Sequence, residues 1–341
     1  MAGIANRRQP TEVECDRLRE AAEDGDVDDI KTLASSGVDV NAVVYHGLNM
    51  SPIHFAAQSG NVDVVKILKE YEADITCQDV YKQTPLHHAA DHGNIDVVIL
   101  LKQYGVDINC RDDYGMTPLM FAAREGHCNV VKMLHEDGAD IIYQDKYGET
   151  PLMRAASNGH TDVVKMLHEF GADVNFQDQD RWTPLMYAAR NGHTDVVKML
   201  HEFGADSNHQ DENGTTSLMW AAHEGHTYAV KTLHELGADI NHQNKDGSTP
   251  LHWAAYNGHT DTVKMLYICG GNIYCENNEH RTPFHDAVDQ MEVDVVKYLV
   301  EELQMDISKF DEEYQIKIEE MLKEASTESH TASSDTQGLS S

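Results

Sequence analysis

Short apolar segments at helical spacing recur along this chain, and polar stretches rich in Asn, Asp and Gly separate them. In TPLMYAARNGH, Leu185 and the two Ala residues of the segment fall on one face of a helix. In the next segment, TDVVKMLHE, Val196 and Leu200 share a face in the same way. The pattern therefore predicts pairs of short helices that are joined by turns.

The ends of each predicted helix carry their own signals. Thr183 followed by Pro184 marks a helix start, because the hydroxyl caps the first turn and Pro has no N–H to leave unpaired there. Gly192 and Gly204 end the two helices. Residues 205–215, ADSNHQDENGT, are too rich in Asp, Asn and Gly for a helix and predict a projecting turn.

The same helix pair recurs every 33 residues. The stretch NGHTDVVKMLHEFGAD occupies residues 158–173 and, letter for letter, residues 191–206. The explicit units begin at Ser51, Thr84, Thr117, Thr150, Thr183, Thr216, Thr249 and Thr282. An atypical ninth unit precedes them, because residues 21–41 match residues 56–76. No single unit can bury its own apolar face, so neighbouring units must stack.

The repeat, D-x-x-G-x-T-P-L-H-x-A-A-x-x-G-H-x-x-V-V-x-x-L followed by G-A-D-x-N, closely resembles the ankyrin repeat. The resemblance covers nine repeats over about residues 17–310. It implies an all-α, ankyrin-repeat solenoid of stacked helix-turn-helix units with β-hairpin-like loops directed to one side. It also implies a concave face made of those loops and the first helix of each unit.

Two positions of the repeat depart from the family pattern. Lys82, Arg181 and His280 replace the turn Gly, and we expect these turns to be locally rebuilt because positive φ is costly for a residue with a side chain. Met replaces the His of TPLH in four successive units, at Met120, Met153, Met186 and Met219.

The two ends of the chain do not follow the 33-residue period. Residues 1–16 form an N-terminal segment that we assign to the cap of the first unit. Residues 311–325 have a mixed apolar pattern among Glu residues, which predicts a C-terminal capping helix. Residues 326–341 are rich in Ser and Thr without an apolar period, which predicts a disordered tail that accepts phosphate.

Composition narrows the class of partner. A formal net charge of −32 argues against binding to nucleic acid or to an anionic membrane, since both need a positive surface. No apolar run approaches the length of a membrane span. The six Cys lack zinc-ligand spacing and are expected to be reduced thiols. Because MAGIANRRQP lacks the apolar segment of a secretory signal, we expect a cytoplasmic or nuclear protein.

The 21 His residues invite a catalytic or metal-binding interpretation, but most occupy positions that the ankyrin motif itself carries. There we expect imidazoles that hydrogen-bond the backbone of their own or the next unit. Four others form a predicted half-exposed ladder on the second helices: His135, His168, His201 and His234. The spacing of stacked helices makes a shared metal ion difficult. Protonation of this ladder near pH 6.5 is hypothesised to destabilise the convex face.

No nucleophile elbow, Walker loop, HExxH or dinucleotide fingerprint occurs. We therefore predict no catalytic, cofactor-binding or metal-binding residue and no enzymatic activity. The predicted function is that of a scaffold or adaptor for other proteins, which binds an extended peptide or a partner domain through the concave surface.

Candidate binding residues are those that vary while the framework stays fixed. The predicted concave strip consists of Phe121, Arg124, Arg154, Arg181, Trp182, Tyr187, Arg190, Trp220, Trp253 and Tyr256. Trp, Tyr and Arg dominate binding hot spots, although some of these rings could simply pack against their neighbours. The Arg residues favour an acidic or phosphorylated peptide at the strip, whereas the total charge favours basic segments elsewhere.

Two regulatory alternatives remain open. Phosphorylation of the Ser/Thr-rich tail is one way to control the strip. The other comes from the turns, where the pattern resembles the substrates of the asparaginyl hydroxylase that uses 2-oxoglutarate. The candidate positions are Asn41, Asn109, Asn175 and Asn241. The same Asn commonly orders the turn, which is the structural alternative.

Overall fold

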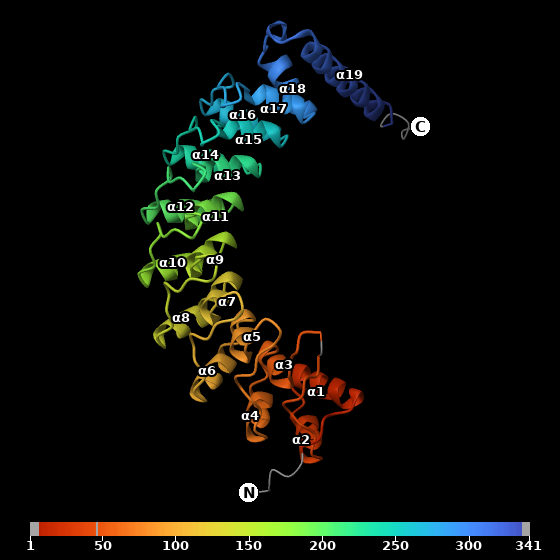
Figure 1. Cartoon of the computed structure of the whole chain (residues 1–341), viewed down its shortest axis with the longest axis vertical. Coiled ribbons are helices and arrows are strands. Elements are labelled where there is room, and N and C mark those ends of the chain that lie inside the picture. Colours follow the sequence, from red (N-terminus) through yellow and green to blue (C-terminus); the bar gives the residue numbers. More distant parts are fainter. Residues whose placement is uncertain (1–6, 46, 336–341) are drawn as a thin grey trace. The chain divides into compact units, whose positions relative to one another are not determined.

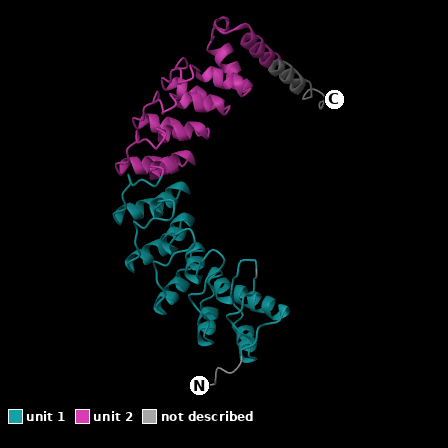
Figure 2. Cartoon of the chain, in the orientation of Figure 1, with its two compact units in different colours: residues 1–179 teal, residues 180–341 magenta. Residues whose placement is uncertain are grey.

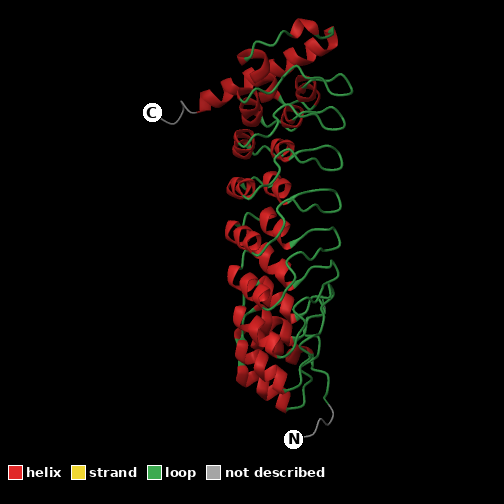
Figure 3. Ribbon diagram, turned by 90° about the vertical axis from the view of Figure 1, so that its left-hand side faces the viewer, coloured by secondary structure: helices red, strands yellow, loops and turns green. Residues whose placement is uncertain are grey.

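The structure is a computed structural model, and it describes residues 7–45 and 47–335. Among these residues the regular elements are helices, and β-type pairing is limited to two isolated bridges, which confirms the all-α prediction (Figure 3). Two compact units divide the chain, residues 1–179 and residues 180–341 (Figure 2). Each unit has its own stack of helix pairs with loops along one side (Figures 1 and 3).

Unit 1 contains five helix pairs. Its first helices are α1 (Glu12–Asp24), α3 (Pro52–Gln58), α5 (Pro85–Asp91), α7 (Pro118–Glu125) and α9 (Pro151–Ser157). Its second helices are α2 (Val27–Ser35), α4 (Val62–Glu70), α6 (Ile95–Gln103), α8 (Cys128–Glu136) and α10 (Thr161–Glu169). First helices pack on first helices and second helices on second helices, so that two parallel rows run through the unit.

Unit 2 contains four helix pairs and a terminal helix. Its first helices are α11 (Pro184–Arg190), α13 (Ser217–His223), α15 (Pro250–Tyr256) and α17 (Pro283–Asp289). Its second helices are α12 (Thr194–Glu202), α14 (Thr227–Glu235), α16 (Thr260–Ile268) and α18 (Val293–Lys297). A π-helical turn at Tyr298–Glu302, a 3-10 turn at Ile307–Lys309 and α19 (Glu312–Asp335) complete the unit.

The core of each repeat lies between its own two helices and those of the next repeat. In the repeat of α5 and α6, Leu86, Val98 and Leu101 are completely buried. Full burial of such a side chain contributes about 1.5–3 kcal/mol. The Thr-Pro-Leu-His segment starts the first helix as predicted, since Thr84 is the N-cap and its backbone N–H donates to His87 Nδ1 at 3.1 Å.

The loops are held by an Asp or Asn at one fixed position. Asp79 Oδ1 accepts from the backbone N–H groups of Tyr81 and Gln83 at 2.8 and 2.9 Å. Successive loop tips are then joined through the backbone, as in the bond from Asp113 N to Tyr81 O of 2.8 Å. This ladder of single bonds fixes the spacing of the loops without forming a continuous strand among the described residues.

The expectation of rebuilt turns at Lys82, Arg181 and His280 is wrong. All three residues adopt the left-handed conformation, with φ of 59°, 65° and 59°. The bond from Lys82 N to Asp79 O is 3.1 Å, the same as the bond from Gly115 N to Asp112 O. The hydrogen bonds of the loop Asp or Asn hold the turn in its usual conformation, so the residue at the tip adopts a strained positive φ and the turn is not rebuilt.

The first helix begins earlier than the predicted solenoid start at residue 17. Residues 12–16, assigned to the N-terminal segment 1–16, form the start of α1. Thr11 and Glu14 make a capping box there, with Thr11 N donating to Glu14 Oε2 at 2.9 Å. Residues 1–6 of that segment lie outside the described residues.

The terminal helix is longer than predicted. α19 packs against α18 and buries Ile318 and Met321, while the Tyr314 hydroxyl donates to Asp289 Oδ1 at 2.6 Å. It continues to Asp335, so residues 326–335, predicted as disordered, are helical. This stretch has no Pro or Gly, and Ser or Thr costs a helix at most about 0.7 kcal/mol each. Residues 336–341 lie outside the described residues.

Candidate functional site

The loop Asp also positions the variable side chain of the first helix. Its Oδ1 atom holds the turn, and its Oδ2 atom is left for the residue that follows TPLH or TPLM. His88 Nε2 lies 3.2 Å from Asp79 Oδ2, and Trp220 Nε1 donates to Asp211 Oδ2 at 3.3 Å. What this side chain offers to a partner therefore depends on how completely the carboxylate engages it.

In unit 1 the predicted strip residues are largely satisfied within the chain. Phe121 is only 3 % exposed, so it does not present its ring to a partner as the predicted strip requires. Arg124 lies over the Phe121 ring, 4.7 Å from its centroid, and pairs with Asp91 at 2.6 Å and Glu125 at 2.7 Å. Its positive charge is compensated before any partner arrives.

Arg154 is held more tightly still. Its Nη2 atom pairs with Asp145 Oδ2, and the Asp145 side chain is fully buried. Its Nε atom lies 3.1 Å from Glu149 Oε2, but without hydrogen-bonding geometry, so this second contact is a charge pair only. A partner carboxylate would have to displace a buried ion pair to reach Arg154.

In unit 2 four of the predicted strip residues are joined by ring contacts, and Tyr256 lines the same hollow as two of them. We define the aromatic row as Trp182, Tyr187, Trp220, Trp253 and Tyr256. Trp182 contacts Tyr187 and Trp220, with ring centroids 5.2 and 4.5 Å apart, and Trp220 meets Trp253 edge to face at 5.2 Å. Tyr256 is 49 % exposed at the end of α15. The structure thus brings together in unit 2 the rings that the sequence singled out.

Two predicted Arg residues accompany this row. The Arg190 guanidinium lies over the rings of Trp182 and Trp220, at 5.4 and 5.5 Å from their centroids, and its Nε is 3.4 Å from Glu224. Arg181 is exposed at the loop tip, and its backbone oxygen accepts from His209 Nε2 at 2.9 Å. Arg190 therefore already uses the aromatic row as a cation-binding surface.

A hollow of about 700 Å³ opens beside the aromatic row on the first helices α13, α15 and α17. The rings of Trp220, Trp253 and Tyr256 line it together with the carboxylates of Asp246 and Glu279. A separate hollow of about 590 Å³ lies among the second helices α14, α16 and α18 and contains no residue of the predicted strip. The hollow beside the aromatic row is lined mostly by polar side chains, and its three aromatic rings lie among four carboxylates.

Arg281 supplies the positive charge within this hollow, and it is already paired. Its guanidinium contacts Asp286 at 3.0 Å and Asp289 at 2.6 Å, which raises the pKa of Arg281 further despite partial burial. Burial acts to raise the pKa of Asp289, but hydrogen bonds from Tyr314 and Arg281 outweigh it and lower that pKa. Asp289 is therefore an anion at neutral pH.

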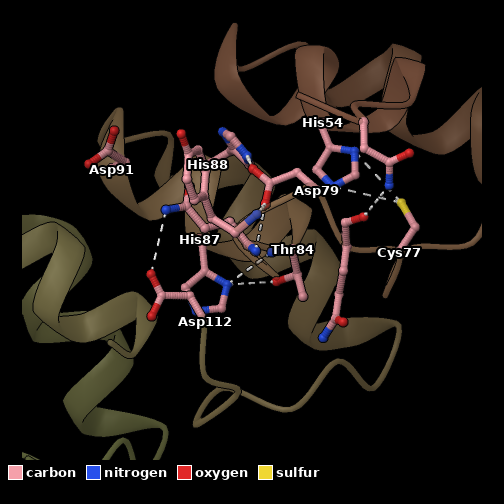
Figure 4. Close-up of polar contacts among 12 residues, drawn as sticks. His54, Cys77, Asp79, Thr84, His87, His88, Asp91 and Asp112 are labelled. Carbon is pink, nitrogen blue, oxygen red and sulfur yellow. Dashed lines mark hydrogen bonds and ion pairs between the residues drawn. The ribbon is translucent and has the colours of Figure 1, made fainter. Parts of the chain in front are cut away.

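The His residues of the TPLH position are structural, as predicted. His87 Nδ1 accepts from Thr84 N, and its Nε2 lies 3.1 Å from the carbonyl oxygen of Met116 in the next unit (Figure 4). Burial lowers the pKa of His54 and of His87 to about 4. Both imidazoles are therefore neutral at pH 7.

The Gly-His position bridges repeats in a comparable way. His127 Nε2 lies 2.8 Å from the carbonyl oxygen of Asp91, and His160 Nε2 lies 2.7 Å from that of Arg124. Gly126 is obligatory beside it, because its φ is 79° and a Cβ there would lie 2.5 Å from the His160 ring.

The predicted ladder His135, His168, His201 and His234 is half-buried, as expected. Two of its members contact local side chains. His135 stacks on Phe170 with ring centroids 3.8 Å apart, and His201 Nδ1 lies 3.2 Å from Ser207 Oγ. Within the described residues no group of three or more His, Cys, Asp or Glu is arranged to hold a metal ion.

One Cys–His pair has the composition of a nucleophile but not its electrostatics. Cys77 Sγ lies 3.8 Å from His54 Nδ1 in the buried cluster of Figure 4. Burial raises the pKa of Cys77 to about 12 and lowers that of His54 to about 4. The proton therefore stays on sulfur, whereas a catalytic Cys requires the thiolate.

The Asn residues proposed for hydroxylation order the turns. Asn41 Oδ1 accepts from Asp74 N at 2.7 Å, and Asn241 Oδ1 accepts from Asn272 N at 2.8 Å. Asn109 makes the same bond to Asp140 N at 3.1 Å, and Asn175 occupies the equivalent position in the last repeat of unit 1. Asn41, Asn109 and Asn241 therefore order their turns, as the structural alternative predicted. Hydroxylation of these residues stays a prediction.

Sequence reasoning missed a set of exposed rings on unit 1. Tyr81, Tyr114 and Tyr147 occupy successive loop tips and are 43, 39 and 50 % exposed. Lys146 Nζ lies 3.9 Å from the Tyr114 ring centroid. The same 33-residue comparison, applied to the loop instead of the helix, reveals this column in the sequence.

Comparisons with known proteins agree with this architecture. A family model described as ankyrin repeats matches residues 18–112, 53–145, 100–178, 152–244 and 218–311. The crystal structure of the human ASB11 ankyrin repeat domain is similar, with 29 % sequence identity and a TM-score of 0.56. The similarity covers 60 % of this chain and 92 % of that one. No curated protein matches this sequence. None of the helices described in the structure is both long and apolar enough for a membrane crossing.

Proposed function

Because this chain belongs to the ankyrin-repeat family, whose repeats are in general protein–protein interaction modules and typically non-enzymatic, we propose that it is a scaffold or adaptor. It binds an extended peptide or a partner domain through the first-helix surface of unit 2. The observation that carries the proposal is the aromatic row, in which the three Trp of the chain lie in one chain of ring contacts.

The mechanism is recognition by a surface that is already ordered. Trp220 is fixed by its bond to Asp211 and by rings on both sides, so little conformational entropy is lost when a partner binds. Trp and Tyr bury much area with few rotatable bonds, which makes them frequent hot spots. Trp253 and Tyr256 border the hollow and are the anchors that a partner meets there.

Unit 1 contributes less to this function than the sequence indicated. Arg124 and Arg154 were expected to pair with acids of a partner, but both are ion-paired within the chain. Phe121 is buried. We therefore restrict the proposed site to the aromatic row, with Arg190 and Arg181 at its edge.

The test compares matched aromatic losses in the two units. Wild type, a Trp220→Ala, Trp253→Ala variant and a Tyr81→Ala, Tyr114→Ala variant are used for quantitative affinity capture from cell extract. We expect the Trp variant to lose at least about tenfold in recovery of its partners, as hot-spot truncations of about 2 kcal/mol do, while the Tyr variant retains them. Unchanged far-UV circular dichroism shows that the variants are folded. Equal recovery by all three proteins would refute the proposal.

The regulatory alternatives have separate tests. A chain ended after residue 325 should bind the same partners, and a changed partner set would favour control by the tail. Intact mass after incubation with the asparaginyl hydroxylase tests the second alternative, and the absence of added oxygen would remove it. Asn41 and Asn241 are engaged by the next repeat, so the folded turns compete with modification. The cytoplasmic or nuclear location remains part of the proposal.

A further inference from the structure

The aromatic row contains an internal example of how it binds a cation. Arg190 lies over Trp182 and Trp220 and is balanced by Glu224. One repeat further on, the residue equivalent to Arg190 is His223, whose ring lies 5.3 Å from the Trp253 ring. No Lys or Arg among the described residues lies over the Trp253 ring, which borders the hollow together with Tyr256.

The charges around Trp253 are those that a cation requires. Asp246 and Glu279 are exposed at successive loop tips and line the same hollow as Trp253. Neither carboxylate forms an ion pair within the described part of the chain. Aromatic faces attract cations, and the attraction increases where carboxylates lie beside the ring.

The other two carboxylates of the hollow, Asp286 and Asp289, already form ion pairs within the chain. Arg281 pairs with Asp286 and Asp289, and Lys317 of α19 lies 3.5 Å from Asp289. Beyond Lys323 the sequence contains no Lys or Arg. Residues 324–341 therefore supply no Lys or Arg for the Trp253 position, which favours an occupant from another molecule.

We propose that the hollow of unit 2 binds a lysine or arginine side chain from a basic segment of a partner protein. The cation lies over Trp253 and Tyr256, and Asp246 and Glu279 balance its charge. This inference rests on the proposed function and specifies its ligand chemistry. It reverses the sequence-based expectation of an acidic or phosphorylated peptide, because Arg124, Arg154 and Arg281 are neutralised by carboxylates of the chain.

Intrinsic fluorescence reports on this site directly, since all three Trp of the chain belong to the aromatic row. The full chain is titrated with acetylated and amidated Gly-Ser peptides that carry two arginines, two lysines, two citrullines or two phosphoserines. We expect saturable changes in Trp emission with the Arg or Lys peptide. The citrulline peptide, which keeps the shape but not the charge, should bind at least about tenfold more weakly.

Charge-removing variants locate the binding. Asp246→Asn with Glu279→Gln should weaken binding of the cationic peptide by about tenfold, as expected for two partly exposed pairs. The control is Glu202→Gln with Glu235→Gln, which removes the same charge from second helices of the same unit. Equal weakening in both variants would mean non-specific attraction and would overturn the inference.

Preference for the phosphoserine peptide would also overturn it. The proposed function is tested independently by the capture experiment. If the Trp variant loses its partners while no cationic peptide binds, the surface is correct and the ligand chemistry is wrong. If cationic peptides bind but the Trp variant retains all its partners, the hollow exists without the proposed scaffold role.

Discussion

The two units use one framework for opposite purposes at the residue that follows TPLH or TPLM. In unit 1 this position holds Arg154, and Asp145 engages it in a buried ion pair. In unit 2 the equivalent position after TSLM holds Trp220, and Asp211 accepts only from the indole N–H. Where the loop carboxylate pairs with a cation, that side chain is not available to a partner. Where the carboxylate accepts a hydrogen bond from an indole, the rest of the ring remains available.

The loop tips show the reverse distribution. Tyr81, Tyr114 and Tyr147 mark the tips of unit 1, whereas the equivalent tips of unit 2 include Asp246 and Glu279. Unit 2 therefore has an aromatic row on its first helices and carboxylates at two loop tips, whereas unit 1 has exposed Tyr rings at its loop tips and ion-paired Arg residues on its first helices. The lesson is that repeat identity fixes packing but leaves the chemistry of the exposed face free to change from one unit to the next.

We expect acidification to destabilise unit 1 through its buried His residues, and this is the largest of the effects that we predict. His54 and His87 are buried, with pKa values lowered to about 4. Above pH 6.5 these two imidazoles are neutral in both states and do not reduce the free energy of unfolding. As the pH falls from 6.5 toward 4, the free energy of unfolding decreases, because the imidazoles are protonated in the unfolded chain but not yet in the folded one. At pH 5 each should cost unit 1 about 2 kcal/mol of unfolding free energy, measured by urea titration with circular dichroism.

The chain supplies the matched control for this prediction. Met occupies the same position in the four middle repeats, so a His54→Met, His87→Met variant is a replacement that the framework already accommodates. The variant should lose most of the difference between its urea midpoints at pH 7.5 and pH 5. Trp emission reports unit 2 alone, where His252 and His285 are unchanged, so its pH dependence should be the same in the variant and in wild type. An undiminished pH dependence in the variant would show that other groups are responsible.

The helix pairs were predictable because their signals are local. Thr84, Pro85 and the apolar spacing of each repeat determine where a helix starts and which face it buries, and the structure agrees. The longer α19 was missed because the absence of an apolar period was interpreted as disorder, whereas a stretch without Pro or Gly can continue a helix that has already begun.

The site was predictable only in part because pairing across the loop cannot be seen in a linear sequence. Trp182, Trp220 and Trp253 were identified from a single 33-residue column and its neighbour, and they do meet. Arg154 was identified by the same reasoning, but its partner Asp145 lies in the loop that precedes it. Residue type indicated hot-spot potential, and only the fold shows which charges are already compensated.

The ion pair of unit 1 gives a second, smaller effect. Arg154→Met leaves Asp145 buried and uncompensated, so we expect the free energy of unfolding to fall by about 3 kcal/mol. Arg190→Met in unit 2 should cost at most about 1 kcal/mol, because Arg190 is 48 % exposed and its pair with Glu224 is loose. Urea titrations followed by circular dichroism measure both. Similar losses of unfolding free energy in the two variants would mean that the Arg residues of the two units are equally engaged within the chain.

The smallest effect tests the framework that the units share. Asn41 and Asn241 each bridge to the next repeat, through bonds from their Nδ2 atoms to Glu72 O and Gly270 O of 3.2 and 3.1 Å. Replacement by Ala removes equivalent, partly exposed bonds and should cost about 1 kcal/mol in either unit. Urea midpoints of the two single variants should therefore shift alike. If only one of the two variants shifts its urea midpoint, the two units differ in their packing as well as in their surfaces. The difference between the Asp145–Arg154 pair and the Asp211–Trp220 pair would then have to be explained by packing and not by residue type alone.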